Sequence, residues 1–139
     1  MTYDVMTTRK LRKKIKIKLP GDIYDFLKQY AKSKQEHFIV ATLNGACEVI
    51  AVHIASIGLV NRVIIHPREV FRHAIADNAS AVIVAHNHPS ENIQPSPEDE
   101  EITRRLNEAA KVVGINFVDH LIITKYCYYS FRQEKKLED

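Results

Sequence analysis

The chain has 139 residues, of which 45% are hydrophobic and 27% charged, a composition typical of one globular domain and unlike that of disordered or fibrous proteins. Its apolar runs are far shorter than the ~20 residues of a membrane-spanning helix, and its basic N-terminus lacks the apolar stretch of a secretory signal. The sequence therefore predicts a cytoplasmic domain with no membrane partner. It contains two cysteines, Cys47 and Cys127, and we expect both to be free thiols packed in the interior.

The N-terminal segment is strongly basic. Residues 9–18 hold seven lysines and arginines and no acid, although the formal net charge of the whole chain is only +3. Leu11, Ile15 and Ile17 alternate with lysines at a period of two, which favours an edge strand guarded by charge. The same cations, Arg9 to Lys18, could instead contact DNA weakly and without sequence specificity. We expect residues 1–19 to form a basic arm or an edge strand, and both interpretations stay open.

The next segment predicts a helix followed by a hairpin. Apolar residues recur at helical spacing over residues 22–33, with Asp22 as the helix cap. Two short apolar runs, His37–Leu43 and Val49–Ile57, then predict antiparallel strands. Asn44-Gly45 between them is suited to a tight hairpin turn.

The middle of the chain predicts a helix between two apolar runs. Val60–Ile65 is expected to extend the sheet, and Pro67 opens a helix that ends near Asp77. Ala81–Ala85 is uniformly apolar, as expected of a strand covered on both faces, and it leads directly into His86.

The last third predicts a long helix and two strands. Ser96 caps this helix, Pro97 takes its first position and Gly114 follows its end. Its predicted buried face consists of Ile102, Leu106, Ala109 and Val113. Ile115–Ile123 and Tyr126–Phe131 are predicted strands. One sheet flanked by helices, in an α/β or α+β arrangement, is the expected fold class.

Two histidines and one aspartate form a candidate metal site. His86 and His88, one residue apart at a strand end, can direct both imidazoles at one position, and Asp99 in the first turn of the next helix can add a carboxylate. Two nitrogens and one oxygen suit Zn²⁺ and leave the fourth position for a water, whose pKa falls toward ~7. Taken singly, His86 could be a hydrogen-bonded strand-end residue and Asp99 a capping carboxylate. Ser96-x-x-Asp99 fits a capping box, and the Ser96 hydroxyl can also donate into the site.

The combination His86-x-His88-Pro89 and Ser96-x-x-Asp99 resembles the H-x-H-P-x6-S-x-x-D motif of JAMM/MPN zinc metallopeptidases, which include deubiquitinating isopeptidases. Further blocks resemble the bacterial RadC family, in which a JAB-type domain follows a helix-hairpin-helix segment: Pro67-Arg68-Glu69, His86-Asn87-His88-Pro89-Ser90, Pro95-Ser96 and Asp119-His120. The resemblance covers about residues 20–132, followed by a charged tail at 133–139. It implies a single JAB/MPN-like domain with a mixed, mostly antiparallel, curved sheet and about three helices. We expect it to act without the helix-hairpin-helix segment.

The resemblance also implies a catalytic glutamate that takes the proton of the water, and the matching position is Glu36. From the residues alone Glu48, Glu69 and Glu91 would be rivals. Glu91 stands where the RadC family usually has glycine, so we expect a loop of changed shape, or else a carboxylate that takes the open metal position.

The other histidines are expected to be structural. We expect His53 to be a surface or sheet-packing residue and His73 to be solvated. His120 is expected to support the sheet, or to lie behind the metal ligands.

The predicted function is a zinc-dependent hydrolase of peptide or isopeptide bonds, with one Zn²⁺ held by His86, His88 and Asp99, Glu36 and Ser96 as catalytic residues, and a peptide or protein as substrate. Nucleobase deaminase and H-E-x-x-H protease motifs do not occur in the sequence. The alternative is a DNA-repair-associated module of the RadC type with little or no peptidase activity.

Overall fold

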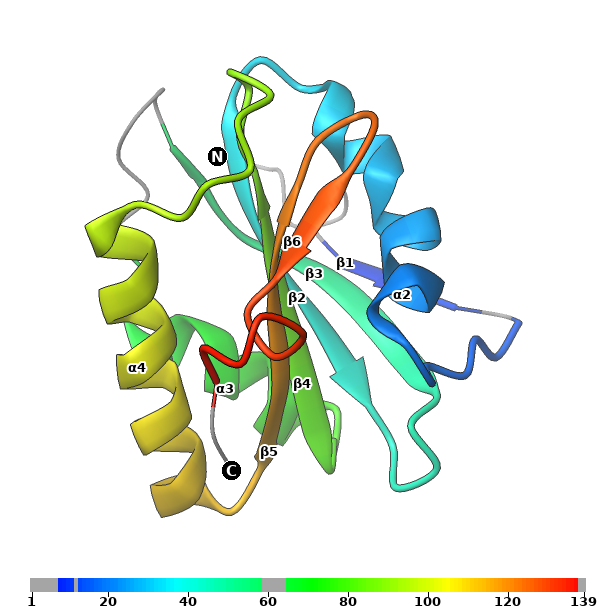
Figure 1. Ribbon diagram of the computed structural model, residues 1–139. Coiled ribbons are helices and arrows are strands. Elements are labelled where there is room, and N and C mark those ends of the chain that lie inside the picture. Colours follow the sequence, from blue (N-terminus) through cyan, green and yellow to red (C-terminus); the bar gives the residue numbers. More distant parts are fainter. Residues whose placement is uncertain (1–7, 12, 59–64, 138–139) are drawn as a thin grey trace.

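A computed structural model of the chain describes residues 8–11, 13–58 and 65–137. Within these residues six strands form one sheet in the order β1-β3-β2-β4-β5-β6 (Figure 1). The strands are β1 (Thr8–Lys10), β2 (Glu36–Leu43), β3 (Val49–Gly58), β4 (Ala81–Asn87), β5 (Asn116–Ile123) and β6 (Tyr128–Ser130). The helices are α2 (Pro20–Leu27), the 3₁₀ helix η1 (Lys28–Lys32), α3 (Pro67–Ala76) and α4 (Pro97–Val113). Among these described strands only the pairing of β4 with β5 is parallel, so the predicted mixed, mostly antiparallel sheet flanked by about three helices is confirmed.

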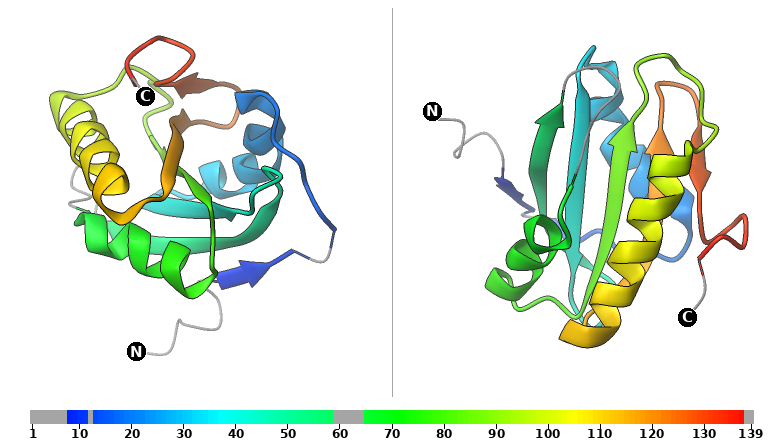
Figure 2. Two further views of the ribbon diagram at one scale, coloured as in Figure 1. Left: turned by 90° about the horizontal axis from the view of Figure 1, so that it is seen from below. Right: turned by 90° about the vertical axis from the view of Figure 1, so that its left-hand side faces the viewer.

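Helices cover both faces of the sheet. α3 and α4 pack on one face, and α2 with η1 packs on the other (Figure 2). β4 lies between the two layers and is buried along its whole length, as its uniformly apolar sequence predicts. Val82 and Val84 contact the α3–α4 layer, whereas Ile83 and Ala85 contact the α2 layer. This burial fixes the end of β4, where His86 lies.

The predicted hairpin of β2 and β3 is confirmed, but its turn is longer than two residues. The Asn44 side-chain oxygen accepts hydrogen bonds from the backbone of Ala46 (2.9 Å) and Glu48 (3.0 Å), which closes the turn. The residue with positive φ is Cys47, at 61°, rather than Gly45. Cys47 and Cys127 are both exposed free thiols, so the prediction that they are packed is wrong.

The edge strand occupies only a short part of the N-terminal segment for which it was predicted. β1 pairs antiparallel with β3 at the sheet edge, but the described residues of the alternating segment that follows have a single bridge, between Lys16 and Glu48. Two hydrogen bonds, from Ile17 to Cys47 and from Val49 to Ile15, hold that segment against the hairpin turn (both 2.9 Å). The chain then leaves the sheet to enter α2, so its alternation does not extend into a ladder.

Helix boundaries differ from the predictions in detail. α2 begins at Pro20, and Asp22 lies inside its first turn, where its carboxylate accepts from the backbone of Lys18 and Leu19 (2.8 and 2.9 Å). α4 has the predicted cap, first residue and left-handed Gly114 (φ 76°). Val113 is 44% exposed rather than buried.

The charged tail and the segment before α3 also bear on the predictions. Leu137 in the charged tail is buried against the core. The predicted strand Val60–Ile65 lies outside the described residues except for Ile65, which is buried. No helix in the described part of the chain is long and apolar enough to cross a bilayer.

Candidate metal centre

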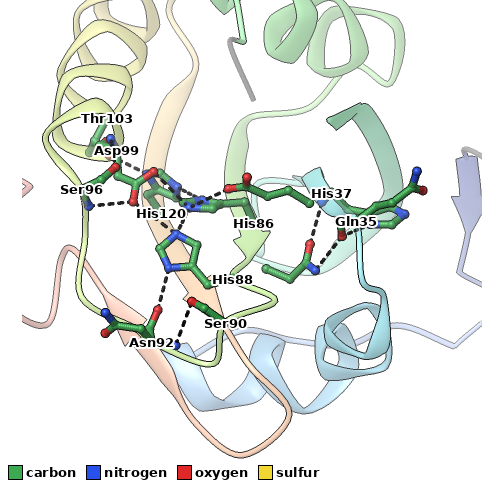
Figure 3. Close-up of polar contacts among 12 residues, drawn as sticks. Gln35, His37, His86, His88, Ser90, Asn92, Ser96, Asp99, Thr103 and His120 are labelled. Carbon is green, nitrogen blue, oxygen red and sulfur yellow. Dashed lines mark hydrogen bonds and ion pairs between the residues drawn. The ribbon is translucent and has the colours of Figure 1, made fainter. Parts of the chain in front are cut away.

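The candidate site lies at one edge of the sheet, where strand ends meet. β4 is parallel to β5 and antiparallel to β2, so the end of β4 adjoins the end of β5 and the start of β2. In register, Phe38 pairs with His86, which brings Glu36 near the histidines. The loop after β4 then returns the chain over this edge, and α4 begins beside His86 (Figure 3).

All four predicted polar groups converge here. The Nε2 atoms of His86 and His88 are 2.9 Å apart, and they lie 3.1 and 3.3 Å from the two carboxylate oxygens of Asp99. A carboxylate oxygen of Glu36 lies 3.9 Å from His86 Nε2. Glu36, His86 and His88 each offer a ligand atom within 4.8 Å of the others, so they form a group that could hold a metal ion. The structure thus brings the predicted residues together, while their individual roles stay predictions.

The hydrogen bonds of His88 fit a metal ligand. Its Nδ1 lies 2.6 Å from the backbone carbonyl of Asn92, and a carbonyl can only accept, so Nδ1 carries the proton. In the neutral imidazole the Nε2 lone pair then points toward His86 and Asp99. Lone pairs and a carboxylate that converge at these distances repel one another unless a cation lies between them.

Electrostatics favour positive charge beside Asp99. Burial opposes the charged carboxylate, but the adjacent imidazoles of His86 and His88 outweigh it and hold the pKa of Asp99 far below its usual value. Burial also opposes a charged His88, yet the bonds to Asp99 and Asn92 raise the pKa of His88. Both shifts show a site in which a carboxylate stays ionised and a neighbouring cation is stabilised.

Asp99 combines the two roles that the sequence left open. Its Oδ2 accepts from the Ser96 backbone (2.9 Å), and the Ser96 hydroxyl oxygen accepts from the Asp99 backbone (3.1 Å), a complete capping box. The same carboxylate faces both histidines. The cap therefore orients the carboxylate toward the site, and the Ser96 hydroxyl proton is left available for another acceptor.

The loop over the site keeps the backbone conformation that glycine would favour. Glu91 has a φ of 67°, and its backbone donates to the His88 carbonyl (2.9 Å). Glu91 thus occupies the left-handed region directly, and the expectation of a changed loop shape stays a prediction. Its side chain is exposed to solvent.

Two polar residues next to the site, Asn87 and Thr103, were not anticipated. Asn87 is fully buried between the two histidines; its side chain accepts from the His37 backbone (2.6 Å) and donates to the Gln35 carbonyl (2.9 Å), so it clamps the residues on either side of Glu36. The feature that could have indicated Asn87 in the sequence is its position, as a polar residue directly after the apolar run and His86. Thr103 bonds His120, which in turn bonds His86.

A second polar cluster lies on β3 and α3. His53 is buried and lies 2.9 Å from the Thr8 hydroxyl and 2.7 Å from the Asp77 carboxylate. The His73 ring stacks on His53 with centroids 4.1 Å apart. The expectation of a solvated His73 is wrong, because α3 packs this side of the helix against the sheet.

The fold and the site together define a JAB-type domain. Residues 17–137 match the sequence profile of the RadC-like JAB domain, so the chain belongs to this family and the predicted resemblance is confirmed. A UPF0758 protein of Methanospirillum hungatei is 57% identical over 91 residues, covering 66% of this chain and 40% of that protein. UPF0758 proteins of Alkaliphilus metalliredigens and Thermotoga maritima are 46% and 42% identical, covering 88% and 83% of this chain and 53% and 52% of their own length. The chain thus spans about half the length of the curated relatives it matches.

Proposed function

We propose that this domain binds one zinc ion and hydrolyses peptide or isopeptide bonds of a peptide or protein substrate. The observation that carries the proposal is the convergence of His86 Nε2, His88 Nε2 and the Asp99 carboxylate, with mutual distances of 2.9 to 3.3 Å. Two imidazoles and one carboxylate are a common zinc-binding set in hydrolases. A bound Zn²⁺ supplies Lewis acidity, which polarises a carbonyl and lowers the pKa of a water ligand toward ~7.

We assign Asp99 as the third ligand and Glu36 as the base. Asp99 approaches both histidines, and its carboxylate is held in place by Ser96. Glu36 lies 3.9 Å from His86 Nε2, which is too far for a direct hydrogen bond and leaves room for a water. From that position Glu36 can take a proton from the water and return it to the leaving amine.

We assign Ser96 the role of stabilising the negative charge that develops on the oxygen of the attacked carbonyl. Its hydroxyl oxygen already accepts from the Asp99 backbone, so its hydrogen is free to donate to the oxygen of the attacked carbonyl. The group lies at the N-terminus of α4, whose dipole favours negative charge at the same place.

Metal content and hydrolysis test the proposal separately. Protein purified without chelator is analysed for zinc and assayed on a panel of peptides and isopeptide-linked substrates. We expect about one zinc per chain in the wild type and little in His86→Ala/His88→Ala. Glu36→Gln should retain zinc and lose hydrolysis, because an amide cannot accept the proton.

The matched control is His37→Gln, which removes an imidazole next to Glu36 but outside the cluster. It should keep both zinc and activity. Equal zinc in the wild type and the double variant would exclude the site, and full activity in Glu36→Gln would place the base elsewhere. A zinc-loaded protein that cleaves nothing in the panel would favour the DNA-repair-associated module.

A further inference from the structure

A buried hydrogen-bonded chain links two of the proposed ligands behind the site. Thr103 Oγ1 lies 2.7 Å from the backbone carbonyl of Asp99 and 2.5 Å from His120 Nδ1. His120 Nε2 lies 2.8 Å from His86 Nδ1 (Figure 3). The three side chains in this series of hydrogen bonds are buried: Thr103 and His86 are 2% exposed, and His120 is fully enclosed.

The Asp99 carbonyl determines which group donates in each of these hydrogen bonds. Because a carbonyl can only accept, the Thr103 hydroxyl donates its one hydrogen to it. His120 Nδ1 must then donate to the Thr103 oxygen. A fully enclosed imidazole bonded to a hydroxyl and another imidazole favours the neutral form, so its Nε2 accepts from His86 Nδ1.

We propose that His120 and Thr103 are positioning residues that hold His86 as the tautomer protonated on Nδ1, with the Nε2 lone pair directed at the metal position. The proposal rests on the zinc site of the proposed function. The opposite tautomer would place a hydrogen on Nε2, between His86 and the carboxylate, and would block coordination. A hydrogen bond to the second nitrogen of a metal-binding histidine orients the ring and raises its basicity.

Packing makes this support rigid. The His120 ring stacks on Phe131 at a centroid distance of 4.7 Å and an interplanar angle of 12°, and Phe38 lies against it at 5.9 Å. The backbone of His120 is fixed by Asp119, whose carboxylate accepts from the backbones of His120 (2.8 Å) and Arg132 (3.0 Å). His120 therefore has little freedom to move when its partners change.

Thr103→Val is the sharpest perturbation, because valine has the shape of threonine but no hydroxyl. The His120 Nδ1 hydrogen then loses its acceptor, and the chain no longer selects one tautomer of His86. Zinc affinity, measured by competition with a chromophoric chelator, should fall about 10- to 100-fold. Thr103→Ser restores the hydroxyl and should return the affinity to within a few-fold of the wild type, and His120→Phe should weaken it as Thr103→Val does.

A second measurement does not need metal. Nitrogen-15 NMR of metal-free wild type should show His86 protonated on Nδ1, and Thr103→Val should shift it toward a mixture of tautomers. Wild-type zinc affinity in a folded Thr103→Val, or an Nε2-protonated His86 in the wild type, would overturn the proposal. Failure of the wild type to bind zinc would refute the proposed function, and the tautomer of His86 would still decide this inference.

Discussion

The stacked His73 makes a testable prediction about acid stability. Burial, the neighbouring His53 and Arg72 all disfavour its charged form, and Asp77 and Glu69 compensate only partly, so the pKa of His73 falls from 6.5 to about 4. Its Nε2 is buried without a hydrogen-bond partner among the described residues. His73→Phe keeps a ring of similar size against His53 and removes the titration.

The magnitude follows from the difference between the folded and unfolded chains. Because the folded pKa is depressed, the unfolded chain binds the proton first, and the stability due to neutral His73 is fully present above pH 6.5. It is lost as the pH falls from 6.5 to about 4, after which the folded state is protonated as well. At about 1.4 kcal/mol for each tenfold change in the protonation equilibrium, and with a reduction for solvent screening of this half-buried ring, the total loss is roughly 2 kcal/mol.

Urea denaturation at a series of pH values, with chelator present so that metal release does not contribute, measures this difference. We expect the wild type to lose about 2 kcal/mol more than His73→Phe across the interval. Above it, the variant should be about 1 kcal/mol more stable, because it lacks a buried nitrogen without a partner. The control His37→Gln removes a histidine outside this cluster and should keep the wild-type acid loss. Parallel pH profiles for His73→Phe and the wild type would refute the reasoning.

Three further outcomes are expected. Glu91→Gly should raise the free energy of unfolding by about 1 kcal/mol, since glycine takes a φ of 67° without strain; a decrease in urea denaturation would show that the side chain makes stabilising contacts. Asp77→Ala should lower the free energy of unfolding by about 1–3 kcal/mol, because its carboxylate bonds Thr42 and His53. Since His53 in turn contacts Thr8 of β1, the β1 amides should exchange faster with solvent, and unchanged protection would contradict this. DNA binding through residues 9–18 should be weak, falling by orders of magnitude between roughly 50 and 200 mM salt, and tight salt-resistant binding would favour the repair module.

Elements whose ends are marked by capping or turn residues were predictable from the sequence. α4 carries a capping serine, a proline at its first position and a glycine after its end, and each of these residues acts on the helix end next to it. The hairpin of β2 and β3 was also predictable, because Asn44 closes the turn with its own side chain.

Features that depend on distant partners were not predictable. The alternating residues after β1 have the pattern of a strand, but β3 begins at Val49, so the segment reaches the end of its partner strand at Ile15. Cys47 and Cys127 were expected inside, yet both lie in turns, where a small side chain meets solvent. The burial of His73 depends on how α3 packs against β3, which helical periodicity does not specify.

The two halves of the candidate centre differ in the same way. His86, His88 and Asp99 lie on one strand end, one loop and one helix start, so their spacing alone indicated a shared site. Glu36 reaches that site only because β2 runs antiparallel to β4 with Phe38 opposite His86, and the resemblance to RadC, rather than spacing, singled it out. The same holds for His120, which meets His86 because β5 runs parallel to β4 after the crossover through α4. The spacing of the proposed ligands is thus set locally, whereas strand order brings the proposed base Glu36 and the proposed positioning residue His120 to the site. Only variants in both sets can show whether the centre acts as one unit.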